Sequence, residues 1–508
     1  MLAAYDGSLP HPRSSTAVQD ATGHFVGSED TPEALYRFNA LGYRGPEFDP
    51  TAPLKVFVAG CSYTFGQGVP LDQTWPSLLT RALAERRGIP ADRANLQNFS
   101  QIGASNEYIS RTIIRQCERI RPDLAIIAFT HRERAEYLAP GVTRNIGLWD
   151  LDGEEAQAAP ALRHFDLFDS PSSSLELLKS MLLVQWAMKR RRIPYLMLWM
   201  NRTGLDQSPV SEHPPLQRLR AMIEPAGLTS RHLLEPDVHV DSNRADRHPG
   251  PLSHANLVPL LLDALARPAA AAPPFPPAVP PTPRRRVLVL GDFPALAPDP
   301  TACPEGPCQC REMAARHRLG EAIVERPLAG PVSNDRLVRT LVEACHRETP
   351  DFVFLAFSSR SGRELLHDGE FVDLGAEAGQ SSGAARLTEA YRRMATDETE
   401  AANTLRNILL AQEFLEARRI PYRFSIPPAL RWRNMSAADT HPVLQTYAAL
   451  VDATALCRRQ PRDGGSVVPP PGGPSRHGPL ESTRALVARL KLRLGKARSE
   501  DPNIYPIW

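Results

Sequence analysis

The chain has 508 residues, a length that suggests about three domains of ordinary size, each with its own apolar core. Its 59 basic and 57 acidic residues give a net charge of +2, so no strong field favours nucleic acid or an anionic membrane. No apolar run approaches the ~18 residues of a transmembrane helix, and no secretory signal peptide is recognisable. Seven irregularly spaced cysteines indicate no disulfide framework. We therefore expect a reduced, cytoplasmic protein.

Residues 1–50 form the first predicted segment, an arm interrupted by Gly, Pro and Ser. It ends in the stretch F-N-A-L-G-Y-R-G, Phe38 to Gly45. We interpret this stretch as a structured arm laid against the domain that follows, without a part in chemistry.

The stretch V-F-V-A-G-C-S-Y-T-F-G, Val56 to Gly66, organises the rest of the chain. Its apolar run predicts a strand buried on both faces of a parallel sheet. A helix is predicted from Thr74 to Ala84, with Pro76 tolerated in its first turn. A strand, a tight turn and a helix in this order place Ser62 at the carboxyl edge of the sheet, where open α/β folds bind ligands.

Further strands and helices follow in alternation. A loop containing Gly103 leads into a helix predicted over residues 107–120, and the buried strand predicted over 121–130 ends in polar residues. Residues 139–171 lack periodicity, so they form either a substrate-covering loop or a surface insertion. A helix with a basic end is predicted over 175–192, before another apolar strand.

Histidines concentrate near the end of this half. In the segment R-A-D-R-H-P-G-P-L-S-H, Asp246 and His248 precede a predicted terminal helix, and Pro249 lets the loop bend so that the carboxylate meets the imidazole. His254 is the second candidate for a catalytic base, although it also suits a supporting place at the start of the helix. His239 is a weaker third candidate, since an isolated histidine is more often structural.

The G-C-S block and the D-x-H-P loop together resemble the first and last signature blocks of the SGNH (GDSL-type) hydrolases, in a divergent form. The resemblance covers residues 51–266 and implies an α/β/α fold with Ser62 as nucleophile and His248 as base, oriented by Asp246. It also implies that the backbone N–H groups of Ser62 and Gly103 form the oxyanion hole.

The third block of that family is not matched, because its Asn is missing here. Thr130, His131 or Arg132 stands at the corresponding strand end, and Asn106 could reach in from the neighbouring loop. Asn106 and Ser105 equally suit the N-cap of the next helix. The third oxyanion donor therefore stays open among Asn106, Thr130 and Arg132.

A proline-rich linker at 267–285 separates a second half, residues 286–458, which repeats the first. The offset is constant, because 334 − 106 and 351 − 123 both give 228 for the matched Asn and Asp residues. We match D-T-H-P, Asp439 to Pro442, with the His248 loop. Phe293 then replaces Ser62, Tyr447 replaces His254 and Pro331 replaces Gly103, so this copy should lack the serine mechanism.

Two features remain outside this scheme. Cys303, Cys308 and Cys310 resemble half of a metal site, but no second cluster of suitable spacing follows, so we expect no metal. Residues 459–508 combine a Gly/Pro-rich linker with a basic amphipathic helix that suits docking onto the domains or a partner better than a membrane.

The sequence thus predicts an α/β protein made of two flavodoxin-like three-layer α/β/α sandwiches with mostly parallel sheets. The first half is expected to be a serine esterase that acts on an acyl or acetyl ester of a small molecule or glycan through an acyl-enzyme, with no cofactor. Two alternatives stay open: an O-acyltransferase of the same fold, and a tandem ligand-binding module without catalysis.

Overall fold

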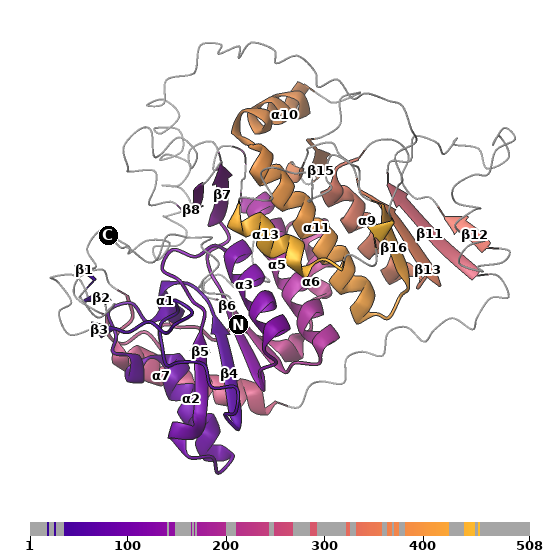
Figure 1. Ribbon diagram of the computed structural model, residues 1–508. Coiled ribbons are helices and arrows are strands. Elements are labelled where there is room, and N and C mark those ends of the chain that lie inside the picture. Colours follow the sequence, from indigo (N-terminus) through magenta and orange to yellow (C-terminus); the bar gives the residue numbers. More distant parts are fainter. Residues whose placement is uncertain are drawn as a thin grey trace, which may run out of the picture.

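The computed structural model describes most of the chain between residues 35 and 457. Its described residues are 18–19, 25–26, 35–139, 142–147, 164, 167, 170–199, 210–242, 248–267, 285–291, 322–325, 332–357, 363–367, 370–374, 382–425, 441–452 and 456–457. The two five-stranded sheets lie side by side with helices between them (Figure 1). All strand pairs within both sheets are parallel. The predicted α/β class with mostly parallel sheets is confirmed.

The first sheet has the strand order β10-β9-β6-β4-β5. Its strands are β4 (Leu54–Ala59), β5 (Ala94–Asn98), β6 (Leu124–Phe129), β9 (Tyr195–Trp199) and β10 (Leu228–Thr229). β4 lies between two neighbours, and Val56 to Ala59 have no exposed surface. The apolar run that predicted this strand is apolar because both faces of the sheet are covered there.

Helices cover this sheet on two sides (Figure 1). On the outer side α2 (Trp75–Arg86) packs against α7 (Pro251–Ala266), and on the side of the second sheet α5 (Ser170–Arg191) packs against α3 (Asn106–Arg119) and α6 (Pro214–Ala221). Short helical turns complete this half at α1 (Ser62–Phe65), η1 (Leu71–Gln73), η2 (Ala91–Arg93) and η4 (Pro225–Gly227). The three-layer order places the carboxyl ends of β4, β5 and β6 at one edge.

The arm pairs three short antiparallel strands, β1 (Val18–Gln19), β2 (Phe25–Val26) and β3 (Leu35–Tyr36). After β3, the predicted F-N-A-L-G-Y-R-G stretch turns back on itself, with an isolated bridge between Phe38 and Arg44. Tyr43 is buried and meets the ring of Phe99 edge-on, at 4.9 Å between centroids. The described stretch from residue 35 to 50 is therefore structured and packed onto the first half.

The second sheet has the order β12-β11-β13-β16-β17. Its elements are β11 (Arg285–Gly291), β12 (Ala322–Glu325), α9 (Asn334–Arg347), β13 (Phe352–Ala356), α10 (Ser382–Met394), α11 (Asp397–Ala417), β16 (Tyr422–Ser425), α13 (Pro442–Leu450) and β17 (Leu456–Cys457). Helices α9, α11 and α13 lie on the side that faces the first half (Figure 1). The outer layer predicted for this sandwich falls on residues outside the described ranges.

One predicted match between the halves is wrong. In the second half α13, which His441 precedes, connects β16 to β17, just as α6, which His213 precedes, connects β9 to β10. His441 less His213 is 228, the offset of the Asn and Asp residues matched in the sequence. D-T-H-P therefore corresponds to S-E-H-P at 211–214 and not to the His248 loop, and Tyr447 does not replace His254.

The segments after β6 and β13 contain hairpins that the sequence did not predict. β7 (Ala135–Ala139) pairs with β8 (Val142–Ile146), and β14 (Glu364–His367) pairs with β15 (Glu370–Asp373). Each hairpin packs on the long helix of the other half, β7 on α11 and β14 on α5, and these two helices also pack on each other. None of the helices in the described ranges is long and apolar enough to cross a membrane.

Candidate active site

The turn after β4 holds Ser62 at the carboxyl edge of the first sheet. Ser62 is the first residue of α1, and a Cβ at Gly60 would lie 2.3 Å from Thr64 Oγ1, so only glycine lets the turn fold directly onto the strand end. Gly66 ends α1 in the left-handed region at φ 79°, which a side chain would strain. Gly60 is thus required by the closeness of the Thr64 side chain, and Gly66 by its backbone conformation.

His248 meets Ser62 across this edge. Its Nε2 lies 2.8 Å from Ser62 Oγ, although the two residues are 186 positions apart in the chain. Both side chains are 3% exposed. The ring of Tyr63 lies beside the imidazole at 5.0 Å between centroids. A neutral imidazole at this distance can accept the hydroxyl proton as Ser62 attacks a carbonyl carbon.

Asp241 holds the loop that carries His248, and the sequence analysis did not single it out. Its carboxylate accepts hydrogen bonds from the N–H groups of Leu252 and Ser253 at 2.9 and 2.7 Å and also from the Ser253 hydroxyl. Burial acts to raise the pKa of Asp241, but the bonds from Ser253 and Leu252 outweigh it and lower the pKa. A Cβ at Gly250 would lie 2.4 Å from this carboxylate, so the glycine admits the contact.

The remaining predicted members of the His248 segment lie elsewhere or outside the described residues. Asp246 falls in the range 243–247, outside the described residues. His254 Nδ1 accepts a hydrogen bond of 3.0 Å from the N–H of Trp75 at the start of α2, and burial with the nearby Arg44 lowers its pKa to about 3. His239 Nε2 lies 2.8 Å from Ser242 Oγ. Neither His254 nor His239 is placed on Ser62 by these contacts.

The loop that carries Gly103 is tied to the end of β4. Gln101 donates its N–H to the Gly60 carbonyl at 3.1 Å, and Phe99 donates to Val58 at 2.7 Å. Gly103 itself has φ 75°, a conformation that glycine adopts without strain. The structure therefore brings the Gly103 loop to the end of β4, from which the turn leads to Ser62.

Asn106 is not available as the third oxyanion donor in this geometry. Its side-chain oxygen accepts from the Thr130 N–H at 2.9 Å, and its amide nitrogen donates to the carbonyls of Thr130 and His131 at 3.3 and 3.2 Å. Ser105 provides the N-cap of α3, with its hydroxyl accepting from the Tyr108 N–H. Asn106 instead fastens α3 to the end of β6.

The other two donor candidates stand at the end of β6. Thr130 is 1% exposed, and its hydroxyl makes no hydrogen bond within the part of the chain that the structure describes. Arg132 donates to Glu133 at 2.9 Å. Burial acts to raise the pKa of Glu133, but Arg132 and His131 together lower it to about 2. Arg132 is thus paired with Glu133, whereas the Thr130 hydroxyl has no bond among the described residues that would compete with donation to an oxyanion.

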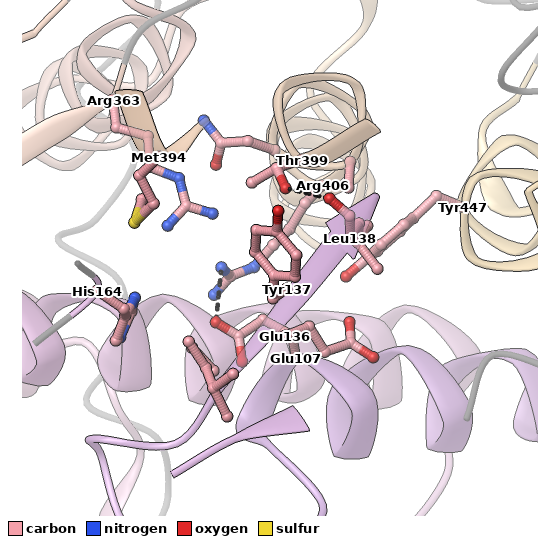
Figure 2. A pocket seen from close by; sticks show the side chains of 14 residues that line it. Glu107, Glu136, Tyr137, Leu138, His164, Arg363, Met394, Thr399, Arg406 and Tyr447 are labelled. Atoms are coloured by element: carbon pink, nitrogen blue, oxygen red, sulfur yellow. Dashed lines mark hydrogen bonds and ion pairs between the residues drawn. The ribbon is translucent and has the colours of Figure 1, made fainter. Parts of the chain in front are cut away.

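A cavity of about 40 Å³ lies between the halves (Figure 2). Glu107, His164, Arg363 and Arg406 are among the residues that line it, and neither Ser62 nor His248 does. Arg406 Nη1 lies 3.7 Å from Glu107 Oε1. The space admits only a few water molecules, so we assign it no substrate. Among the described residues no cluster of ligating side chains could hold a metal ion.

Comparisons with known proteins give only distant likenesses. No protein-family model and no curated protein matches the chain. Among solved structures, TesA is similar at 16% identity over 42% of this chain and 98% of that one, with a TM-score of 0.23. LAE5, an alpha/beta hydrolase enzyme from the metagenome of Lake Arreo in Spain, aligns at 16% identity over 42% and 95%, with a TM-score of 0.25. A two-domain esterase (CEX) active on acetylated mannans aligns at 11% identity over 42% and 48%, with a TM-score of 0.23.

Proposed function

We propose that the first half is a serine esterase that cleaves an acyl or acetyl ester through an acyl-enzyme. The observation that carries the proposal is the 2.8 Å contact between Ser62 Oγ and His248 Nε2. A buried serine hydroxyl and a neutral imidazole at hydrogen-bond distance form the nucleophile and base of acyl transfer. A purely structural pair would not need to lie at the carboxyl edge of a parallel sheet.

In the proposed mechanism Ser62 Oγ attacks the carbonyl carbon of the ester while His248 takes the hydroxyl proton. The backbone N–H groups of Ser62 and Gly103 bind the oxyanion of the tetrahedral intermediate. When this intermediate collapses, the C–O bond to the alcohol breaks and His248 returns the proton to the leaving oxygen. Water then attacks the acyl-enzyme with the same base, which releases the acid. Asp246 is proposed to orient the imidazole.

The substrate class stays as broad as the chemistry: an acyl or acetyl ester of a small molecule or a glycan, without a cofactor. The same acyl-enzyme serves an O-acyltransferase if an alcohol rather than water resolves it. We place the enzyme in the cytoplasm, and the free thiols of Cys61, Cys117 and Cys345 support a reducing compartment.

Hydrolysis of p-nitrophenyl acetate by the full chain tests this proposal. We expect turnover that Ser62→Ala abolishes and His248→Asn reduces by about 10³-fold or more. Sugar acceptors should leave the rate of acetate release unchanged for a hydrolase and replace acetate by acetylated sugar for a transferase. Turnover that is equal in the wild type and Ser62→Ala would overturn the proposal, and a wild type without turnover above the uncatalysed background would favour a binding module.

We also propose that the second half is a duplicate of the first. The supporting contacts repeat at matched positions: 339 − 111, 364 − 136 and 351 − 123 all give 228, and the first-strand residues 286 and 55 differ by 231. Arg111 and Arg339 each form a two-bonded ion pair, with Glu136 and with Glu364, in the hairpin of its own half. Asp123 and Asp351 each accept the N–H of the first sheet strand at 2.7 Å. Chance similarity of two α/β sheets would not reproduce these side-chain contacts at matched positions.

The duplicated half is proposed to be catalytically silent. Phe293, in the place of Ser62, cannot act as a nucleophile, although it lies outside the described residues. With D-T-H-P assigned to another helix, the counterpart of R-H-P-G-P-L at 247–252 becomes R-H-G-P-L at 476–480. The basic helix that we predicted for docking then stands in sequence where α7 stands in the first half.

A further inference from the structure

The F-N-A-L-G-Y-R-G stretch of the arm is built as a tight turn around Asn39. The Asn39 side-chain oxygen accepts from the N–H groups of Leu41 and Tyr43 at 3.0 and 3.1 Å. Its amide nitrogen donates to the carbonyl of Pro46 and to Gln97 on β5 at 3.1 Å. Gly42 supplies the positive φ of 80° that the turn requires. This turn fixes the direction in which the side chain of Arg44, two residues after Gly42, points away from the arm.

Arg44 reaches from the arm to the backbone just after Ser62. Its Nη1 donates to the carbonyls of Phe65 and Gly66, both at 2.7 Å, and its Nη2 donates to Val69 at 2.5 Å. The guanidinium also stacks on the rings of Tyr36 at 4.5 Å and Phe65 at 5.1 Å. Arg44 is 1% exposed, so this contact is a buried one.

The Phe65 and Gly66 carbonyls lie at the end of the helical turn that begins at Ser62. The Ser62 carbonyl accepts the N–H groups of Gly66 and Gln67 at 2.9 and 3.1 Å, so the position of Gly66 sets that of Ser62. Asn98 donates to the Thr64 carbonyl at 2.9 Å from the side of β5. Every side-chain hydrogen bond that the described residues give Arg44 goes to a backbone carbonyl of the segment 65–69. The arginine therefore acts on one segment of backbone.

The Arg44 guanidinium keeps its positive charge although it is buried. Desolvation lowers its pKa to about 10, which leaves the guanidinium protonated at neutral pH. A buried cation stabilised only by carbonyl oxygens and aromatic rings is expensive to maintain. A hydrophobic side chain of the same length would fill the space at less cost if packing alone were needed.

We propose that Arg44 is a positioning residue for Ser62, and that the F-N-A-L-G-Y-R-G turn exists to place it. The inference rests on the proposed serine mechanism. Arg44 contacts the backbone that ends the nucleophile turn, and it keeps Ser62 Oγ within reach of His248 Nε2. An arginine suits the task because its rigid planar fork serves carbonyls in two directions at once, while a lysine offers a single point of donation.

The test compares Arg44→Lys and Arg44→Met with the wild type in the full chain. A fluorophosphonate probe reports the rate at which Ser62 reacts, and p-nitrophenyl acetate turnover separates kcat from KM. Misplacement of the nucleophile by about 1 Å costs roughly 100-fold in rate. We expect kcat and the labelling rate to fall by about 10- to 100-fold in Arg44→Lys and further in Arg44→Met, with KM changed less than threefold.

Arg418→Lys is the matched control. Arg418 also donates to a backbone carbonyl, that of Cys345, and stacks on a ring, that of Phe414, but it belongs to the second half. This control should keep wild-type labelling. Equal losses in Arg418→Lys and Arg44→Lys would assign the effect to general destabilisation and overturn the inference.

Amide hydrogen exchange distinguishes a failure of this inference from a failure of the proposed function. In Arg44→Lys we expect faster exchange at Gly66 and Gln67, whose N–H groups bond the Ser62 carbonyl, with little change in β9. Unchanged exchange at these amides, or wild-type labelling of a folded Arg44→Lys, would overturn the positioning role while the esterase proposal stands. A wild-type chain that never labels at Ser62 would instead overturn the esterase proposal, and the positioning role with it.

Discussion

Ser62 and His248 are brought together by residues that themselves do no chemistry. Gly60 lets the nucleophile turn fold onto β4, and Gly250 lets Asp241 cap the loop of His248. His254, the second histidine of the terminal segment, is buried, and its Nδ1 accepts the N–H of Trp75. Two histidines six residues apart in one motif therefore have different environments, and only His248 is placed for proton transfer to Ser62.

The buried, neutral His254 predicts a dependence of stability on pH. Its pKa of about 3 lies below the ~6.5 of an unfolded histidine, so the unfolded chain binds a proton that the folded chain does not. Stability should fall as the pH drops from about 6.5 toward 3, by up to about 1.4 kcal/mol per pH unit. His254→Asn keeps an acceptor for Trp75 without titrating there, so urea unfolding should show a shallower slope in this window. His164, whose pKa burial lowers to about 3, contributes a remaining slope in both proteins. An unchanged slope would contradict the assignment.

The elements around the site are joined by side chains that bond backbone ends. Asn106 fastens the first turn of α3 to the end of β6, and Asp123 fastens the start of β6 to Lys55 at the start of β4. The first contact fixes the position of α3 along the sheet, and the second fixes the register of β6 against β4. Because β4, β6 and α3 are fixed relative to one another, the groups proposed to act at the carboxyl edge of the sheet are fixed as well.

Asn106→Ala tests whether this residue fastens the elements or serves the oxyanion. The substitution leaves a buried N–H and buried carbonyls without partners, at about 1–3 kcal/mol each, so urea unfolding should show a loss of at least ~2 kcal/mol. Ser105→Ala, which removes only the neighbouring N-cap, is the control with a loss of about 1 kcal/mol. A loss in Asn106→Ala no greater than in the control would contradict the fastening role.

The sequence predicts those parts of the fold that depend on local pattern. The buried strand at Val56, the amphipathic α3 and the turn at Ser62 are each set by residues close together in the chain. The hairpins β7–β8 and β14–β15 escape prediction because each is buried by a helix of the other half, far away in the sequence, as the bonds from Thr399 to Leu138 and from Ser172 to Leu366 show. The role of Asn106 is missed because an asparagine suits both an N-cap and a side-chain bond to a distant strand, and the sequence does not separate the two.

The two halves pack on each other through matched contacts. Thr399 Oγ1 donates to the Leu138 carbonyl at 3.0 Å, and Ser172 Oγ donates to the Leu366 carbonyl at 3.0 Å. The carbonyl positions differ by 366 − 138 = 228 and the hydroxyl positions by 399 − 172 = 227. Such reciprocal contacts are those of an isologous, two-fold interface. We infer that the second half packs on the first as one protomer of a symmetric dimer packs on the other.

Lys179 provides the test at this scale. On α5 of the first half, its Nζ lies 2.7 Å from Asp335 Oδ1 on α9 of the second half, and both side chains are buried. Lys179→Met leaves Asp335 without its cation, so we expect a loss of about 3–5 kcal/mol and two separated calorimetric transitions. Lys189→Met, on the same helix but paired within the first half with the partly exposed Glu224, should cost less than ~1 kcal/mol. A single transition with a small loss in Lys179→Met would show that the halves are not coupled in this way.

The contact between Ser62 and His248 is tested most directly by locating the covalent adduct of a fluorophosphonate. Peptide mass spectrometry of the labelled full chain should find one phosphonate, on the peptide that contains Ser62. We expect none in Ser62→Ala and labelling slower by about 10³-fold in His248→Asn. A probe that reacts equally with His248→Asn, or a wild-type chain that stays unlabelled, would contradict the account.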